Sequence, residues 1–234
     1  MKYTYLFINV FSILIPLARS FESKLKFYHR WICYLPAIAI TAGVFVLWDY
    51  FKTKAGVWSF NDAYILGYKK GGLPLEEYLF FITIPYSCVF VYDVVSHFIN
   101  KNVFSPKLGQ LLNFMSFVSL VLSVFLFHLT YTFSVLFIIS FVIPITVYIL
   151  NTAQLDRLAL TFLLCLLPMF VVNGLLTGLP VVLYDNSRNT AIRVGTIPIE
   201  DFIYFAILLS MNITIYESLR KNHSKHLKLF PPSI

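Results

Sequence analysis

Charge is scarce in this chain. Only 12% of its 234 residues are Asp, Glu, Lys or Arg, about half of the roughly 25% found in soluble domains. Hydrophobic residues supply 59% of the sequence, and the mean hydropathy is +0.77. The composition therefore excludes an ordinary soluble globular domain and indicates an integral membrane protein.

Cofactor signatures are missing as well. Cys33, Cys88 and Cys165 lie singly within apolar stretches, without the spacing of a metal site or a disulfide framework. The sequence contains no G-x-G-x-x-G fingerprint of a flavin or nicotinamide site. We therefore expect no cofactor and no metal. The net charge of +7 comes from loops and tails, where anionic lipid headgroups are the expected partners rather than nucleic acid.

Long apolar stretches are the main feature present. There are seven, mostly of about 20 residues, enough to cross a hydrocarbon core of roughly 30 Å. Because backbone polar groups in lipid must be satisfied internally, each stretch is predicted to be a helix. The predicted fold is an all-α membrane protein with seven transmembrane helices, the first of which is short and has a signal peptide as its alternative. The stretches are Tyr3–Ala18, Trp31–Phe51, Leu75–Phe98, Leu108–His128, Tyr131–Leu150, Leu158–Leu179 and Ile199–Leu219.

Basic residues are divided unequally between the two sets of loops. Of the 18 Lys and Arg, 11 lie in the tail and in the loops after the first, third and fifth stretches. By the positive-inside rule, we expect a multi-pass protein of the cell membrane with its N-terminus outside and its C-terminus in the cytoplasm. The larger set is Arg19, Lys24, Lys26, Arg30, Lys101, Lys107, Arg157, Arg220, Lys221, Lys225 and Lys228.

An internal repeat accounts for the odd number of stretches. The segment Pro74–Phe81 (PLEEYLFF) returns 124 residues later as Pro198–Phe205 (PIEDFIYF), without a gap. The same offset aligns the last three stretches with the first three, and the fourth stretch is then a connector between the two repeats. We expect parallel 3+1+3 repeats related by an axis along the membrane normal, with residues 1–98 as the first repeat, 99–130 as the connector and 131–234 as the second repeat with a basic tail.

Two acidic doublets open the third and seventh stretches. Each follows a proline that suits the start of a helix, where the helix dipole favours a carboxylate. Acids at membrane depth are functional candidates by default, so Glu76, Glu77, Glu200 and Asp201 are predicted to form one acid–base set. The alternative is that they cap two helices at the membrane interface.

Other polar and aromatic residues are predicted to support the acids. Asp49 and its repeat mate Asn173 lie in the second and sixth stretches, and Asp49 is either a further acid or an interfacial residue held by aromatic neighbours. Phe80 and Tyr204 follow the doublets by one helical turn and would line the site. The full supporting set is Asp49, Asn61, Phe80, Asn173, Arg193 and Tyr204.

The tryptophans and two further acidic residues are expected to have structural roles. The three tryptophans are expected in the aromatic belts of the membrane interface. Asp93 and Glu217, at the other ends of the third and seventh stretches, are expected to pair with nearby Lys or Arg.

The chain resembles the small integral-membrane lycopene cyclases of bacteria, archaea and fungi. The resemblance covers nearly the whole chain and rests on the duplicated Pro-x-Glu-Glu/Asp motif with its flanking Trp-Asp and Leu-Thr-Gly-Leu-Pro-Val-Val runs. In some bacteria the family occurs as two half-size subunits, as the repeat would suggest. Thr190-Ala191 stands where the family usually has Leu-Gly, so the loop before the second doublet is expected to be shaped differently. The resembling segments are Pro16–Tyr28, Phe45–Tyr50, Gly56–Gly67, Gly72–Phe81, Asn173–Tyr184 and Ile192–Phe205.

The resemblance implies a redox-neutral cyclisation of lycopene to γ-carotene and then β-carotene. An acid protonates the terminal double bond at C2, the C5–C6 double bond closes the ring, and a base removes the proton at C6. The chemistry asks for one neutral carboxylic acid and one carboxylate in a dry site. The expected partners are lycopene, the monocyclic intermediate, the lipid bilayer and other enzymes of carotenoid biosynthesis.

Alternatives remain at this stage. A related enzyme that makes ε-rings or cyclises longer carotenoids would need the same acids. A seven-helix carotenoid- or retinal-binding protein is another class, although the last stretch has no mid-span lysine for a retinal Schiff base. A small transporter would be expected to have helices interrupted near the midplane, for which Pro85, Pro144 and Pro168 are candidates.

Overall fold

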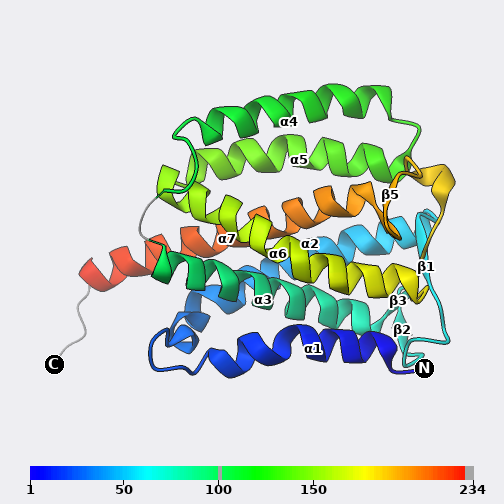
Figure 1. Cartoon of the computed structure of the whole chain (residues 1–234), viewed down its shortest axis with the longest axis horizontal. Helices are drawn as coiled ribbons and strands as arrows, with labels where there is room; N and C mark the ends of the chain where they lie inside the picture. The colour runs from blue at the N-terminus through cyan, green and yellow to red at the C-terminus, as the bar shows by residue number, and fades with distance from the viewer. Residues whose placement is uncertain (100–101, 230–234) are drawn as a thin grey trace.

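A computed structural model describes residues 1–99 and 102–229, with the side chains of 224–229 excepted. The described chain is a bundle of seven α-helices (Figure 1). Lys101, the side chains of Lys225 and Lys228, and tail residues 230–234 lie outside this description. The helices are α1 (Thr4–Arg19), α2 (Trp31–Lys54), α3 (Leu75–Phe98), α4 (Leu108–Phe125), α5 (Thr130–Ile149), α6 (Thr152–Gly178) and α7 (Ile199–Leu229).

The prediction of an all-α membrane protein is confirmed. Six of these helices are long and apolar enough to cross a membrane, and α1, with 16 residues, is a shorter apolar helix. The largest difference is at α7, which ends ten residues after the predicted Leu219. α6 begins six residues before the predicted Leu158. Asn151 and Gln154 form a capping box there, and these polar residues stabilise a first turn that an apolar count leaves out.

Helices α3 and α7 form the centre of the bundle. More than half of each apolar span is buried, a larger share than in the other long spans. α1, α2 and α6 pack on α3, while α5 and α2 pack on α7, and α4 lies at the edge against α5 (Figure 1). Both central helices begin at the same end of the bundle, so the two acidic doublets lie at the same end.

Three short antiparallel strand pairs, absent from the all-α prediction, gather at that end, which we call the strand end (Figure 1). Two of them are hairpins that lead directly into the central helices: β2 (Lys69–Lys70) with β3 (Leu73–Pro74) before α3, and β5 (Arg193–Val194) with β6 (Ile197–Pro198) before α7. These hairpins fix where the first turns of α3 and α7 begin.

The third pair joins the two halves of the chain. β1 (Trp58–Phe60) and β4 (Val182–Tyr184) align Trp58 with Tyr184 and Phe60 with Val182. Its centre aligns Ser59 with Leu183, which are 124 residues apart. Each strand therefore pairs with its own equivalent in the sequence repeat.

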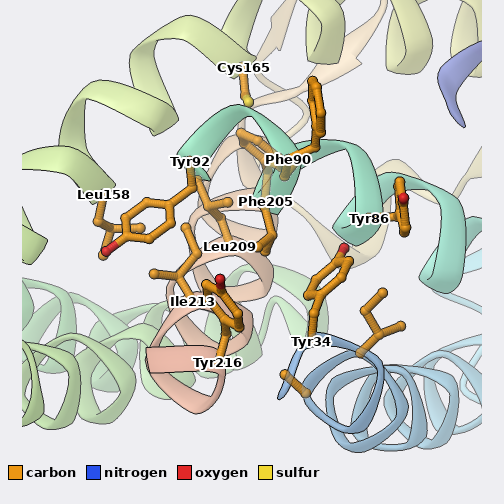
Figure 2. Close-up of a cluster of buried hydrophobic side chains, with 14 of the residues drawn as sticks. Tyr34, Tyr86, Phe90, Tyr92, Leu158, Cys165, Phe205, Leu209, Ile213 and Tyr216 are labelled. Carbon is orange, nitrogen blue, oxygen red and sulfur yellow. The ribbon is translucent and has the colours of Figure 1, made fainter. Parts of the chain in front are cut away.

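A cluster of aromatic and aliphatic side chains fills the opposite end of the bundle, which we call the far end (Figure 2). Tyr34 of α2 lies between Tyr86 of α3 and Tyr216 of α7, with ring centroids 5.4 and 5.9 Å away. Phe90 and Tyr92 of α3 belong to the same cluster. These contacts bury the far end of the interface between the central helices.

The acids of the far end have basic or polar partners. Asp93, which is buried, forms an ion pair with Arg30. Glu217 accepts hydrogen bonds from Gln154 Nε2 at 2.6 Å and from Tyr92 at 3.0 Å, and Arg220 Nη2 lies 2.8 Å from it. The sequence-based expectation of structural pairing is thus confirmed for Asp93 and Glu217.

Replacing Arg30 with Met should leave the carboxylate of Asp93 buried without a cation. We expect a loss of about 3 kcal/mol in the free energy of unfolding, the lower end for a broken buried ion pair, because Arg30 is partly exposed. Thermal unfolding in detergent measures it. Adding Asp93→Asn should recover most of the loss, and equal stabilities of the single and double variants would contradict this account.

Candidate functional site

A cavity of about 770 Å³ lies between α1, α3, α6 and α7. Its walls are mostly aliphatic and aromatic. Of the described residues that line it, three are Asp, Glu, Lys, Arg or His, and all three carry carboxyl groups: Asp49, Glu77 and Asp201. Ligand sites of this size, roughly 300–1,000 Å³, are usually apolar with a few convergent polar groups. The cavity is therefore the candidate functional site.

The two acids of each doublet point in different directions from their helix. Successive residues of an α-helix point about 100° apart, so only the second acid of each doublet, Glu77 or Asp201, faces the cavity. The first acids hold the preceding loops instead. Glu76 Oε1 accepts the backbone N–H of Leu66 at 2.7 Å, and Glu200 Oε1 accepts the N–H of Thr190 at 2.8 Å.

The two loops that receive the first acids have the same backbone plan. Leu66 and Thr190, 124 residues apart, each donate their N–H to the first acid. The next residues, Gly67 and Ala191, both have positive φ, at 93° and 57°. The two loops therefore share this backbone feature, although one contains Leu66-Gly67 and the other Thr190-Ala191. The substitution adds a hydroxyl donor, since Thr190 Oγ1 also lies 2.8 Å from Glu200 Oε1.

Two carboxyl groups meet on the first-half side of the cavity. Asp49 on α2 and Glu77 on α3 are within hydrogen-bonding reach of each other. Tyr5 donates to Glu77 Oε2 at 2.6 Å, and Tyr204, from the second half, donates to Asp49 Oδ1 at 2.7 Å. A hydrogen bond between two carboxyl groups requires that one of them carries a proton. Asp49 is buried, so the interfacial interpretation of this residue is wrong.

Asp201 has a different environment. It accepts hydrogen bonds from Tyr131 at 2.7 Å and from Tyr184 at 3.0 Å, and Asn173 Nδ2 lies 3.5 Å from Oδ2. Tyr184 belongs to a strand outside the membrane-spanning helices, and burial together with the adjacent Asp201 carboxylate raises the pKa of its phenol well above the usual value. The Tyr184 hydroxyl therefore stays protonated and remains a donor to Asp201.

Aromatic rings line the cavity near the acids. Trp58 meets Tyr131 edge to face at 5.1 Å and Tyr204 at 6.5 Å, and Phe80 also lines the cavity. Trp48 packs on Tyr204 at 5.0 Å. Trp48 and Trp58 are both buried. Their π faces therefore lie in the interior of the protein rather than on its outer surface, where a belt residue would be expected.

Two of the predicted supporting residues lie outside the cavity. Asn61 Oδ1 accepts the N–H of Ala63 at 3.0 Å, which shapes the loop after β1. Arg193 donates to the carbonyl of Thr196 at 2.7 Å and to Asn186 at 2.8 Å. Its guanidinium lies 5.8 Å from the Tyr184 ring. The structure thus brings Asp49, Phe80, Asn173 and Tyr204 to the site and leaves Asn61 and Arg193 in the loops.

The sequence reasoning missed Tyr5, Tyr131, Tyr184 and Trp58. The tyrosines donate to the cavity carboxyl groups, but none lies one helical turn from a doublet. Tyr131 and Tyr184 lie 70 and 17 residues from Asp201, so local spacing gives no sign of the contact. A tyrosine near an apolar stretch reads as an interfacial residue unless its partner is known.

The fold and the site define a membrane-embedded protein whose cavity presents carboxyl groups to an apolar, lipid-soluble molecule. The lycopene cyclase family matches the chain in two segments, residues 2–95 and 128–219. Together these cover most of the sequence, and the chain belongs to the lycopene cyclase family. The two matched segments coincide with the two halves of the sequence repeat.

One curated protein with a similar sequence is described as bifunctional. The chain is 35% identical over 80 residues to a bifunctional lycopene cyclase/phytoene synthase of Pyrenophora tritici-repentis (strain Pt-1C-BFP). The match covers 34% of this chain and 13% of that protein. The aligned part is therefore a small share of the relative's length. No solved structure matches the chain.

Exchanging the loop residues at positive φ should change stability in opposite directions. Ala191→Gly should stabilise the protein by about 1 kcal/mol, because left-handed backbone costs an L-residue about 1–2 kcal/mol. Gly67→Ala should destabilise it by a similar amount. A Cβ at Gly67 would meet no atom within 4 Å, so this change tests the backbone alone.

Gly43→Ala is the matched control for these variants. Gly43 lies inside α2, and an added Cβ there also meets nothing within 4 Å. Alanine should stabilise the helix by up to about 1 kcal/mol. Thermal midpoints in one detergent would compare the three variants, and a loss of stability in Ala191→Gly would contradict the interpretation of the loop.

Proposed function

We propose that the chain is a lycopene β-cyclase that converts both linear ends of lycopene to β-rings by acid–base catalysis. The observation that carries the proposal is the presence of two unlike carboxyl environments in one apolar cavity. Asp49 and Glu77 lie within hydrogen-bonding reach of each other, whereas Asp201 accepts from two tyrosines. An acid and a base in separate environments are what the cyclisation needs.

The Asp49–Glu77 pair is the proposed proton donor. Two carboxyl groups in contact hold one proton between them, because like charges at this distance disfavour double ionisation. Tyr5 and Tyr204 donate to the pair and stabilise the single negative charge that remains. Protonation of the terminal double bond of the substrate at C2 forms a new C–H bond and leaves a carbocation on the neighbouring carbon.

Asp201 is the proposed base. Hydrogen bonds from Tyr131 and Tyr184 favour its ionised form. After the C5–C6 double bond closes the ring, the carboxylate removes the proton from C6 and restores a double bond. The proton then returns from Asp201 to the Asp49–Glu77 pair, so the cycle consumes no oxidant, reductant or water.

The aromatic walls suit the cationic stage of this reaction. Trp58, Phe80 and Tyr204 line the cavity beside the acids, and an aromatic face attracts a cation through the ring quadrupole. The β1–β4 pair lies over the strand end of the cavity and would keep water from trapping the cation as an alcohol. Glu76 and Glu200 hold the loops before α3 and α7 by accepting their backbone N–H groups.

The proposed architecture is a 3+1+3 arrangement of parallel repeats, with α4 in the connector 99–130 between units 1–98 and 131–234. The register of β1 and β4 supports a two-fold axis, because Ser59 pairs with its own repeat mate Leu183. A two-fold axis requires such self-complementary contacts. With the basic loops at the far end, we propose that the strand end faces outward and the tail lies in the cytoplasm.

One alternative class loses support from the helices. A transporter of this kind would be expected to have discontinuous helices at its binding site. Pro85, Pro144 and Pro168 lie inside continuous helices in α3, α5 and α6. A carotenoid-binding protein without catalysis would need no second, differently bonded carboxyl group in the cavity.

Expression in a lycopene-accumulating host tests the proposal directly. We expect γ-carotene and β-carotene to appear in the extracted pigments, separated by chromatography. Unchanged lycopene alongside good membrane expression would overturn the assignment. If ε-rings formed in place of β-rings, the assignment of the acid–base site would stand, and only the carbon from which the base removes the proton would be different.

Single isosteric replacements of the four doublet acids test which of them take part in catalysis and which hold the loops. Asp201→Asn and Glu77→Gln should reduce cyclisation by about 10² or more, the usual contribution of a general acid or base. Glu76→Gln and Glu200→Gln should retain most activity at matched expression, because these acids contact loops. Equal losses in all four variants, or none in the cavity pair, would contradict this division between cavity and loop acids.

A further inference from the structure

The cavity reaches the outer surface of the bundle along one side. Five large lining residues are also more than half exposed: Phe7 (64%), Phe11 (78%) and Ile15 (70%) on α1, and Leu167 (74%) and Val171 (56%) on α6. A side chain that belongs to both the cavity wall and the outer surface lies at an opening. These five residues define the α1–α6 opening, and all are apolar.

The two ends of the cavity are closed. At the strand end, Trp58, Phe60, Val182 and Tyr184 of the β1–β4 pair form part of its lining. Towards the far end, the lining stops at Cys88, Val91 and Cys165, beside the aromatic cluster of Figure 2. The apolar α1–α6 opening therefore faces the hydrocarbon layer rather than water on either side.

The dimensions of the cavity limit what it can enclose. From Glu77 to Val91 along α3 it extends about 20 Å, at about 1.5 Å per residue. The extended chain of a whole tetraterpene is longer than this, although the cavity volume of about 770 Å³ lies within the usual range of ligand sites. Its three carboxyl groups lie at the strand end, so only the portion of the ligand inserted there can react.

We propose that a linear polyene enters the cavity end-first from the lipid through the α1–α6 opening, while the rest of the molecule stays in the bilayer. This inference rests on the proposed function and adds its route and its order. One end is cyclised in each binding event. The monocyclic product leaves through the same opening, turns in the lipid and returns with its second end.

Tryptophan at the opening tests the route. Ile15→Trp and Val171→Trp should each slow the loss of lycopene about tenfold or more, because added bulk in a packed passage is poorly accommodated. Leu14→Trp and Leu164→Trp are matched controls on the same two helices. Leu14 (54%) and Leu164 (51%) are similarly exposed but do not line the cavity, and we expect wild-type rates for both.

The assay uses the full chain in liposomes loaded with lycopene, with size-exclusion profiles to confirm folding. If a Trp variant at the opening does not fold, Ile15→Phe and Val171→Phe replace it, and they should also slow cyclisation relative to the matched controls Leu14→Phe and Leu164→Phe. Equal rates in opening and control variants would overturn the route. An inactive wild-type chain would instead overturn the proposed function.

A time course with the wild-type chain tests the order. Free monocyclic product should accumulate in the lipid to an amount greater than that of the protein before the bicyclic product rises. Added monocyclic carotenoid should then compete with lycopene and be converted. Bicyclic product formed from the start, without free intermediate in excess of the protein, would overturn end-first binding.

Discussion

Carboxyl groups buried in an apolar bundle must have hydrogen-bond donors, and much of this structure follows from that requirement. The doublet acids are 0% (Glu76), 6% (Glu77), 1% (Glu200) and 4% (Asp201) exposed. An unpaired charge in such a place would be neutralised or expelled. The loops therefore donate their N–H groups to the first acids, and tyrosines from segments distant in the sequence donate their hydroxyls to the second. The donors that stabilise the acids also determine which of them remain available to a ligand.

The two halves of the chain supply unequal chemistry to a shared cavity. At one pair of equivalent positions the first half has Asp49 and the second has Asn173; at another, Phe80 corresponds to Tyr204. Because Tyr204 donates to Asp49, the second half completes the carboxyl pair of the first. The repeat provides two similar backbone arrangements. These substitutions give the carboxyl groups of the two halves different hydrogen bonds.

The fold was largely predictable from sequence because lipid allows few solutions for the backbone. Seven apolar stretches leave little choice but helices, and the repeated doublets mark the two helices that carry the acids. The choice between neighbouring acids was not predictable. Glu76 and Glu77 have the same chemistry and adjacent positions, and the rotation of α3 about its axis depends on packing. Contacts such as that between Tyr5 and Glu77, 72 residues apart, come from tertiary structure and leave no local pattern.

The pairing of β1 with β4 has a consequence for the ancestry of the chain. A strand that pairs with its own equivalent can do so equally well between two separate copies of a half-length polypeptide. Such a homodimer would carry identical residues at each pair of equivalent positions and so could not separate donor from acceptor by sequence. Gene duplication and fusion through a linking helix would free each copy to mutate independently. The contrast between Asp49 and Asn173 is the kind of divergence that this history permits.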